Sequence, residues 1–357
     1  MKLKETFSAA VLMKTSEPLQ IINNICMPTP KKGQVLVKIR YAGLCHSQLM
    51  EIKGARGEDK YLPHMLGHEG VGQVVAIGEG VSKVNLEDTV VLSWIKGEGI
   101  DAGGAQYQTT DGLIINSGAI TAFSEYALVS ENRLLLKPAG TPDKLSVLYG
   151  CALPTGFGMV VNNLPEQATG HIGFLGLGGI GISALLAAKL YDFSQVIVID
   201  VNPDKLALAK TLGATHAINA RDPDFIEQIY QLTDGVGLDY CFESAGKAET
   251  IEKAYALTRR QGGLCIFASH PPHGDKIQLD PFDLICGKNI RGTWGGETQP
   301  ERDIKQFSGL YDKGQLPLDA LISQSYRLDE INEAVNDLTQ QNIVRALIDC
   351  HPEEAVC

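Results

Sequence analysis

A glycine-rich segment, G-L-G-G-I-G at residues 176–181, restricts the possible folds of this chain more than any other feature. It follows the predicted strand His171–Leu175 and opens the apolar predicted helix Ile180–Leu190. The order strand, glycine loop, helix is the context that makes a G-x-G-x-x-G spacing informative. The segment therefore predicts a βαβ unit that binds a dinucleotide at the start of its helix.

Five of the six positions of this loop have a physical role. Gly176 permits a tight turn, Gly178 lets the backbone approach a pyrophosphate, and Gly181 lets the helix pack closely against the strand. Gly179 and Ile180 open the helix, whose N-terminus carries partial positive charge. We therefore expect all five residues to belong to a cofactor site.

Two later residues indicate which dinucleotide is bound. Asp200 ends the next predicted strand, nineteen positions after Gly181 (200 − 181), where a carboxylate can accept hydrogen bonds from the adenosine ribose hydroxyls. The 2′-phosphate of NADP would meet that carboxylate as a like charge. Lys205, one turn into the following helix, is placed to reach the same ribose. The pattern predicts a preference for NAD.

The second half of the chain continues this alternation of strands and helices. Strands are predicted at 171–175, 196–200, 217–219, 238–243, 263–268 and 289–293, and helices at 180–190, 203–212, 224–232, 248–258 and 281–286. Six strands joined by helices are what a doubly wound Rossmann domain requires. Before about Gly150, short strands are instead separated by Gly and Pro, at 34–40, 70–77, 89–93 and 125–129. After Trp294 we predict helices at 301–311 and 328–338 and a strand at 344–349.

Length and composition support two domains in an ordinary globular α/β protein. The 357 residues exceed the size at which one hydrophobic core usually keeps growing. We predict a Rossmann domain at 153–294 and a β-rich domain made of 1–152 and 295–357. The formal charge of −11 disfavours nucleic acid or an anionic membrane as partner. No apolar run is long enough to span a membrane, and the eight cysteines are dispersed, so we expect a cytoplasmic protein with mostly buried, unpaired thiols.

Three residues in the flanking regions offer metal-ligand chemistry. Cys45 follows a predicted strand, His68 follows a turn, and Cys151 lies just before the dinucleotide domain. Two thiolates and an imidazole would leave a fourth tetrahedral position open, as a catalytic zinc ion needs. Taken singly, each residue is more often a packed core or turn residue, and spacing alone does not bring them together.

The motifs around these residues resemble a known family. G-L-C-H-S (43–47), G-H-E-G-V-G (67–72), G-C-A-L-P-T-G-F-G (150–158) and the glycine loop occur in the order and spacing of the zinc-containing medium-chain dehydrogenases, over nearly the whole chain. The chain looks most like the alcohol dehydrogenases, including the glutathione-dependent formaldehyde dehydrogenase branch, which shares F-S-E-Y (123–126). The resemblance implies a GroES-like catalytic domain beside the Rossmann domain, and reversible hydride transfer between an alcohol and NAD.

The resemblance also implies roles for individual residues. Cys45, His68 and Cys151 would hold one catalytic zinc ion per subunit, with Glu69 beside the metal either as an alternate ligand or as a group that contacts the ligands without binding the ion. Ser47 would hydrogen-bond the substrate oxygen and pass its proton outward.

Further roles carried by the resemblance concern the cofactor, the substrate and assembly. His46 and Arg345 would contact the pyrophosphate, Thr155 the nicotinamide, and Trp94 would wall the substrate pocket. Family members usually form homodimers or homotetramers through the edge strand of the nucleotide domain, here Asn289–Thr293.

The chain departs from the family pattern in three places. The stretch 94–120 contains no cysteine, whereas many relatives hold a structural zinc there, so no second zinc is expected. Gln48 stands where relatives commonly have an Asp that supports the zinc histidine. The Gln carbonyl can still hold the imidazole N–H but contributes no charge. Met50 replaces a proton-relay His.

Several alternatives stay open at this stage. The substrate could be a sugar-derived or other polar secondary alcohol. A zinc-free reductase of activated double bonds would not need the Cys45, His68 and Cys151 set, and a non-catalytic NAD-binding relative has only Gln48 and Met50 in its support. The i, i+4 pair His64 and His68 does not predict a metalloprotease, because Pro and Gly flank it and no Glu follows His64.

Overall fold

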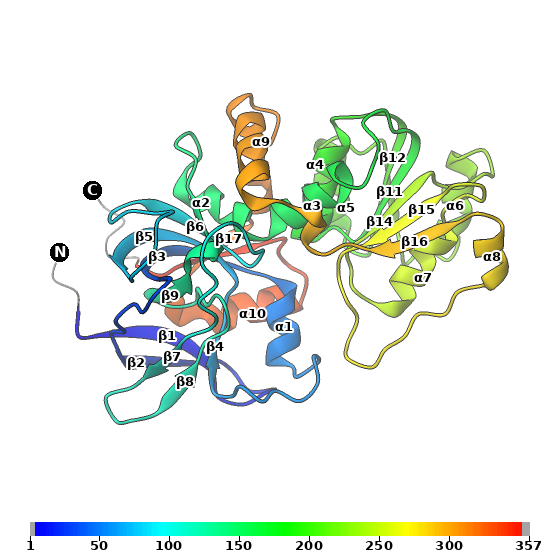
Figure 1. The fold of residues 1–357 in the computed structure, drawn as a ribbon. Helices are drawn as coiled ribbons and strands as arrows, with labels where there is room; N and C mark the ends of the chain where they lie inside the picture. Colours follow the sequence, from blue (N-terminus) through cyan, green and yellow to red (C-terminus); the bar gives the residue numbers. More distant parts are fainter. Residues whose placement is uncertain (1–3, 352–357) are drawn as a thin grey trace. The chain divides into compact units, whose positions relative to one another are not determined.

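The computed structural model describes residues 4–351 (Figure 1). Contacts divide the chain into two compact units, one made of residues 1–151 and 299–357, the other of residues 152–298. The predicted domain limits, after residues 152 and 294, lie one and four residues from these boundaries. Each unit is described below by itself.

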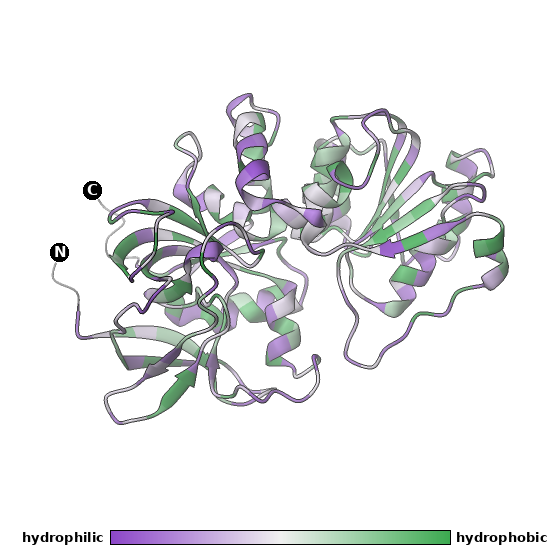
Figure 2. Cartoon of the chain, in the orientation of Figure 1, coloured by the Kyte–Doolittle hydropathy of each residue, from purple (hydrophilic) through white to green (hydrophobic). Residues whose placement is uncertain are grey.

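The second unit contains a six-stranded sheet in the order β13-β12-β11-β14-β15-β16, and every neighbouring pair in it is parallel. This confirms the predicted doubly wound sheet. The strands are largely apolar (Figure 2), as expected where helices cover both faces. The strands are β11 (Thr169–Leu175), β12 (Asp192–Asp200), β13 (His216–Asn219), β14 (Tyr240–Glu243), β15 (Leu264–Phe267) and β16 (Asn289–Gly292). The helices are α3 (Ala152–Val161), α4 (Gly179–Ala188), α5 (Pro203–Thr211), α6 (Phe225–Leu232), α7 (Ala248–Ala256) and α8 (Pro281–Ile285), with a 3₁₀ turn η3 (Gly295–Glu297).

The first unit is built on two sheets, in the orders β2-β1-β4-β8-β7 and β10-β6-β5-β3-β18-β17, with β9 also pairing with β3. Its strands are β1 (Thr6–Leu12), β2 (Gln20–Cys26), β3 (Gln34–Leu44), β4 (His64–Met65), β5 (Glu69–Ile77), β6 (Thr89–Ser93), β7 (Gln106–Gln108), β8 (Ile114–Asn116), β9 (Tyr126–Ser130), β10 (Leu134–Leu136), β17 (Gln324–Arg327) and β18 (Ala346–Asp349). Its helices are α1 (His46–Ile52), α2 (Asp143–Ser146), α9 (Pro300–Asp312) and α10 (Ile331–Thr339), with 3₁₀ turns η1 (Glu131–Arg133), η2 (Val147–Gly150), η4 (Leu318–Leu321) and η5 (Leu328–Glu330). The terminal strand β18 pairs with β3, so distant parts of the chain complete one sheet.

Helix α3 is an element that sequence reasoning did not predict. It contains Pro154, Gly156 and Gly158, which are poor helix formers. The structure explains both glycines: a Cβ on Gly156 would lie 2.1 Å from the carbonyl oxygen of Ile180, and one on Gly158 would lie 2.5 Å from Thr298 Oγ1. Close packing against α4 and the 292–298 segment therefore overrides local propensity.

The buried carboxylate of Glu131 anchors the stretch 94–120, which contains no cysteine. Glu131 is 1% exposed, and it accepts hydrogen bonds from the backbone N–H groups of Ser82 (2.6 Å), Lys83 (2.7 Å) and Ile100 (2.8 Å). Glu301 Oε1 accepts another from the N–H of Glu98 at 2.8 Å. Two carboxylates thus hold the 98–100 segment to the body of the unit.

Replacing Glu131 with alanine is expected to lower the free energy of unfolding by about 2–4 kcal/mol, because three part-buried backbone N–H groups would lose their charged acceptor. Urea unfolding at one pH would measure the change. Glu79→Ala serves as the control, since Glu79 is exposed. Equal stability of the two variants would show that the carboxylate does not hold the loop.

Within residues 4–351, no single helix is long and apolar enough to cross a membrane.

Candidate functional site

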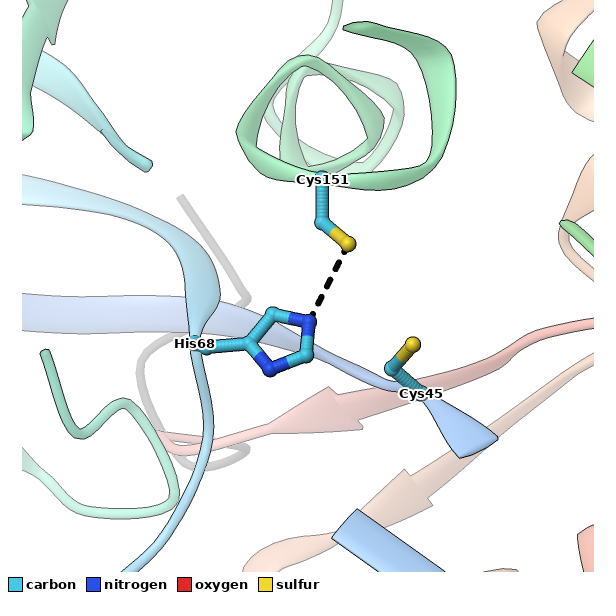
Figure 3. A group of neighbouring side chains, drawn as sticks. All are labelled: Cys45, His68 and Cys151. Carbon is cyan, nitrogen blue, oxygen red and sulfur yellow. Dashed lines mark hydrogen bonds between the residues drawn. The ribbon is translucent and has the colours of Figure 1, made fainter. Parts of the chain in front are cut away.

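Three predicted ligands converge in the first unit. Cys45 caps the N-terminus of α1 directly after β3, His68 lies in the turn before β5, and Cys151 follows η2. One ligand atom from each lies within 4.8 Å of the others, and His68 Nε2 is 3.1 Å from Cys151 Sγ (Figure 3). The structure thus brings together residues that no sequence spacing connects.

The donor set of this cluster fits a zinc ion. Two sulfurs and an imidazole nitrogen are zinc ligands of choice, and three protein ligands leave a fourth position for a substrate. A hydrogen bond from the Cys151 thiol lowers the pKa of Cys45, helped by the positive charge of Arg345. The same shared proton raises the pKa of Cys151. The cluster is therefore ready to supply at least one thiolate.

Two side chains of α1 contact the ring of His68 on the nitrogen that faces away from Cys151. Gln48 Nε2 lies 2.5 Å and Ser47 Oγ 3.2 Å from His68 Nδ1. The side-chain oxygen of Gln48 accepts a hydrogen bond from the backbone N–H of Cys45 at 3.0 Å. Gln48, 1% exposed, therefore joins two of the predicted ligands.

The structure places Glu69 beside the ligand cluster rather than in it, and its role toward the metal stays a prediction. Its carboxylate is fully buried but does not belong to the ligand cluster, because Oε1 forms an ion pair with Arg345 at 2.6 Å. Burial raises the pKa of Glu69, and the charge of Arg345 opposes that rise. The backbone of Gly43 packs so closely that a Cβ there would lie 1.9 Å from Glu69 Oε1. Glu69 thus neutralises a buried arginine beside the cluster.

The pyrophosphate role of Arg345 stays a prediction, as does that of His46, which is exposed at the start of α1. Arg345 is 4% exposed, and its guanidinium is directed at Glu69. The substrate-pocket role of Trp94 also stays a prediction, and the centroid of its ring lies 6.5 Å from that of the His68 ring.

Both ring nitrogens of His64 have hydrogen-bond partners close to it in the sequence. Its Nε2 lies 2.8 Å from Asp59 Oδ2 and its Nδ1 lies 3.0 Å from the carbonyl oxygen of Met65. It belongs to strand β4, so a helical His-pair metalloprotease site does not form here.

The glycine loop of the second unit has the predicted geometry. Gly176 has φ +94°, and a Cβ there would lie 2.7 Å from the backbone nitrogen of Ala245. A Cβ on Gly181 would lie 1.8 Å from the carbonyl oxygen of Gly176, whereas one on Gly178 would meet nothing within 4 Å. The first and third glycines therefore serve packing, and the second leaves backbone open at the start of α4.

Asp200 lies at the end of β12, beside this loop. Its carboxylate accepts hydrogen bonds from the backbone N–H of Leu177 at 2.6 Å and from that of Asn202 at 2.9 Å. Burial lowers the pKa of Lys205, while the charge of Asp200 raises it. The two predicted ribose residues therefore lie close enough to influence each other.

Sequence reasoning missed Glu243, a fully buried carboxyl group at the end of β14. Its Oε1 accepts hydrogen bonds from Ala245 N (2.9 Å), Gly246 N (2.8 Å) and Thr250 Oγ1 (2.7 Å). Its Oε2 has no hydrogen-bond partner within residues 4–351. Burial raises the pKa of Glu243 to about 7, against the effect of these hydrogen bonds. A single acidic residue closing an apolar strand was the available signal.

Replacing Glu243 with glutamine is expected to change how stability depends on pH. Because its pKa is raised from the ordinary 4.5 to about 7 in the folded chain, its contribution is full below pH 4.5 and is lost as pH rises through 7. The loss amounts to about 3 kcal/mol. Urea unfolding at pH 5 and pH 8 should therefore show a smaller decrease for Glu243→Gln than for the wild type. Identical decreases would mean that Glu243 is ionised at both pH values.

Thr155 is buried in α3, and its Oγ1 has no hydrogen-bond partner in the described part of the chain. A buried hydroxyl without a partner is costly and is compatible with a ligand contact. The contact of Thr155 with nicotinamide stays a prediction.

Two family models and several known proteins match this chain. A family model described as zinc-binding dehydrogenase matches residues 179–312, and one described as alcohol dehydrogenase GroES-like domain matches residues 31–139. The S-(hydroxymethyl)glutathione dehydrogenase of Synechocystis sp. is 30% identical, over 95% of this chain and 98% of that protein. The chain belongs to the zinc-containing medium-chain alcohol dehydrogenases. It is therefore an oxidoreductase that interconverts alcohols and carbonyls with zinc and a nicotinamide cofactor.

Other relatives also match this alcohol dehydrogenase over nearly the whole length of both chains. The S-(hydroxymethyl)glutathione dehydrogenase of Paracoccus denitrificans is 28% identical, over 95% of this chain and 98% of that protein. The crystal structure of benzyl alcohol dehydrogenase from Acinetobacter calcoaceticus matches with a TM-score of 0.87 and 30% identity, over 97% of this chain and 99% of that one. An alcohol dehydrogenase zinc-binding domain protein from Burkholderia ambifaria matches with the same score and identity, over 96% and 98%.

Proposed function

We propose that this alcohol dehydrogenase oxidises an alcohol to its aldehyde or ketone reversibly, with NAD as hydride acceptor and Cys45, His68 and Cys151 as the ligands of one catalytic zinc ion. The observation that carries the proposal is the convergence of three ligand atoms within 4.8 Å from three separate segments. When bound, zinc supplies a Lewis acid that polarises the substrate oxygen.

The chain's own residues would bind, orient and move a proton. Ser47, next to the cluster, would hydrogen-bond the substrate oxygen and carry its proton outward, because a hydroxyl donates and accepts at once. Met50 has no group that relays a proton, so water or a ribose hydroxyl would complete the route. The open backbone at Gly178 would receive the pyrophosphate, and Asp200 would accept from the adenosine ribose.

An aromatic or otherwise apolar primary alcohol is the substrate class that we favour. Trp94 lies beside His68, and an aromatic ring there would favour an apolar substituent over a polyol chain. Two similar proteins are named for S-(hydroxymethyl)glutathione and benzyl alcohol, which are primary hydroxyl compounds.

A substrate screen on the purified chain tests the proposal. Benzyl alcohol, aliphatic alcohols, S-(hydroxymethyl)glutathione and sugar-derived polyols would each be assayed with NAD and with NADP, and zinc per subunit would be measured in the same preparation. We expect one zinc per subunit and the highest kcat/KM with NAD and an apolar primary alcohol. Bound zinc and NAD without turnover would instead indicate a non-catalytic relative. Reduction of activated double bonds without zinc would indicate a zinc-free reductase.

We further propose that two or more copies assemble through the edge strand β16. This strand ends the parallel sheet, and the neighbouring helix α8 exposes apolar side chains, with Phe282 56% and Ile285 79% exposed. Light scattering after size exclusion would give the subunit number, and Ile285→Lys should lower it.

Cytoplasmic residence is supported by the seven described cysteines, all of which are free thiols.

A further inference from the structure

Gln48 uses both ends of its side-chain amide inside the metal centre. Its oxygen accepts from the backbone N–H of Cys45 at 3.0 Å, and its nitrogen lies 2.5 Å from Nδ1 of His68. The side chain is 1% exposed, so water does not readily replace either contact. The amide therefore couples the backbone at one ligand to the ring of another.

The orientation of this amide follows from the donor and acceptor roles of its partners. A backbone N–H can only donate, so the group at Cys45 requires the amide oxygen. The amide nitrogen then faces His68 Nδ1 and can only donate as well, so Nδ1 must accept. A neutral imidazole carries one N–H, and that N–H therefore lies on Nε2, where it can donate to Cys151 Sγ at 3.1 Å.

This tautomer is the opposite of the one that a metal requires. Nε2 is the ring nitrogen beside Cys151, and it can ligate only through a free lone pair, which places the N–H of a neutral ring on Nδ1. The Nδ1–H group would then oppose the N–H donors of Gln48 across 2.5 Å. Either the amide turns over and Cys45 N–H loses its acceptor, or Nδ1–H finds another acceptor.

Ser47 is the other acceptor within reach. Its Oγ lies 3.2 Å from His68 Nδ1, and a hydroxyl can accept from the ring while it donates elsewhere. Accepting from Nδ1–H would also direct the Ser47 O–H away from the ring. Among the described residues, Ser47 and Gln48 are the two side chains with defined hydrogen-bond contacts to His68 Nδ1.

We propose that Ser47 accepts the Nδ1–H of His68 in the zinc-bound enzyme and that the donor end of Gln48 opposes this state, so that Gln48 lowers the zinc affinity and Ser47 sustains it. Both act here as positioning residues toward His68. The inference rests on the zinc site of the proposed function.

Gln48→Glu is the decisive substitution. A carboxylate of the same length can accept from Cys45 N–H with one oxygen and from His68 Nδ1–H with the other. The zinc Kd, measured by competition with a chelating indicator at one fixed pH and without substrate, is expected to fall about tenfold or more. Gln48→Met has a side chain of similar length without a strong donor or acceptor. It removes the opposing donor but offers His68 Nδ1–H no acceptor, so its zinc affinity should stay below that of Gln48→Glu.

A double-mutant cycle separates this mechanism from the added negative charge. Ser47→Ala should weaken zinc binding about tenfold or more in the wild-type background and should have little effect in the Gln48→Glu background, where the carboxylate has replaced the hydroxyl as acceptor. Ser47→Thr, which keeps the hydroxyl, should restore wild-type zinc affinity. A purely electrostatic effect would instead make Ser47→Ala equally costly in both backgrounds.

The outcomes distinguish this inference from the proposed function. One zinc per subunit in the wild type, together with an unchanged Kd in Gln48→Glu or in Ser47→Ala, would overturn the inference and leave the proposed function standing. A wild-type chain that binds no zinc would overturn both. Nitrogen-15 spectra of the zinc-loaded wild type give a second readout: a proton on Nε2 of His68 would contradict the inference.

Discussion

Replacing His68 with alanine is expected to lower kcat/KM for alcohol oxidation at least about a thousandfold, because the polarisation of a substrate oxygen by a metal is worth several kcal/mol. The same variant should lose its zinc, since two sulfurs would be left to hold the ion. Steady-state kinetics and metal analysis on one preparation would measure both effects. Loss of zinc and loss of rate should occur together.

Cys350→Ala is the matched control for this result. Cys350 is a buried thiol of the same unit and is not part of the ligand cluster. We expect it to keep its zinc and most of its kcat/KM, at some cost in stability. If His68→Ala retained one zinc per subunit and near wild-type turnover, the assignment of the metal centre would be wrong.

Replacing Asp200 with alanine is expected to lower the ratio of kcat/KM with NAD to that with NADP by about a hundredfold. The variant loses a charged acceptor for the ribose hydroxyls, and it also loses the negative charge that repels a 2′-phosphate. The rate with NADP should therefore rise while the rate with NAD falls. Kinetics with both cofactors at saturating alcohol would measure the ratio.

Two comparisons isolate the ribose effect of Asp200. Asp204→Ala removes an exposed carboxylate from the start of α5 and should leave the cofactor ratio unchanged. Asp200→Asn keeps one acceptor oxygen for the N–H groups of Leu177 and Asn202, so it separates loop stability from charge. An unaltered ratio in Asp200→Ala would remove this residue from the ribose site.

Local patterns in the sequence were sufficient for most of the second unit. The apolar runs and the glycine loop predicted its six strands in the correct order along the chain, because period, turn glycines and strand length are all local properties. Helix α3 was not predicted, since its Pro and Gly residues oppose helix formation and only contact with α4 favours it. Strands β1 and β2 were missed as well, and they are paired with each other over a connection of seven residues.

The composition of the metal centre could be inferred in advance, but its hydrogen bonds could not. Cys45, His68 and Cys151 were identified from their motifs, whereas the amide of Gln48 proved to present its donor end to His68. That orientation depends on the backbone N–H of Cys45. The identity of a side chain determines which donors and acceptors it carries. It does not determine which of them face each other in the folded chain.

Residue types and short-range order thus specified the glycine loop, the strand and helix pattern and the kinds of ligand atom available. Long-range strand pairing specified which of these groups meet: β18 lies against β3, and Arg345, immediately before β18, is paired with Glu69 rather than left free. Glu69 is consequently the counter-ion of Arg345 beside the ligand cluster. The periodicity of a chain constrains neighbours within a few residues, whereas contacts between positions hundreds of residues apart depend on how complete sheets close and pack.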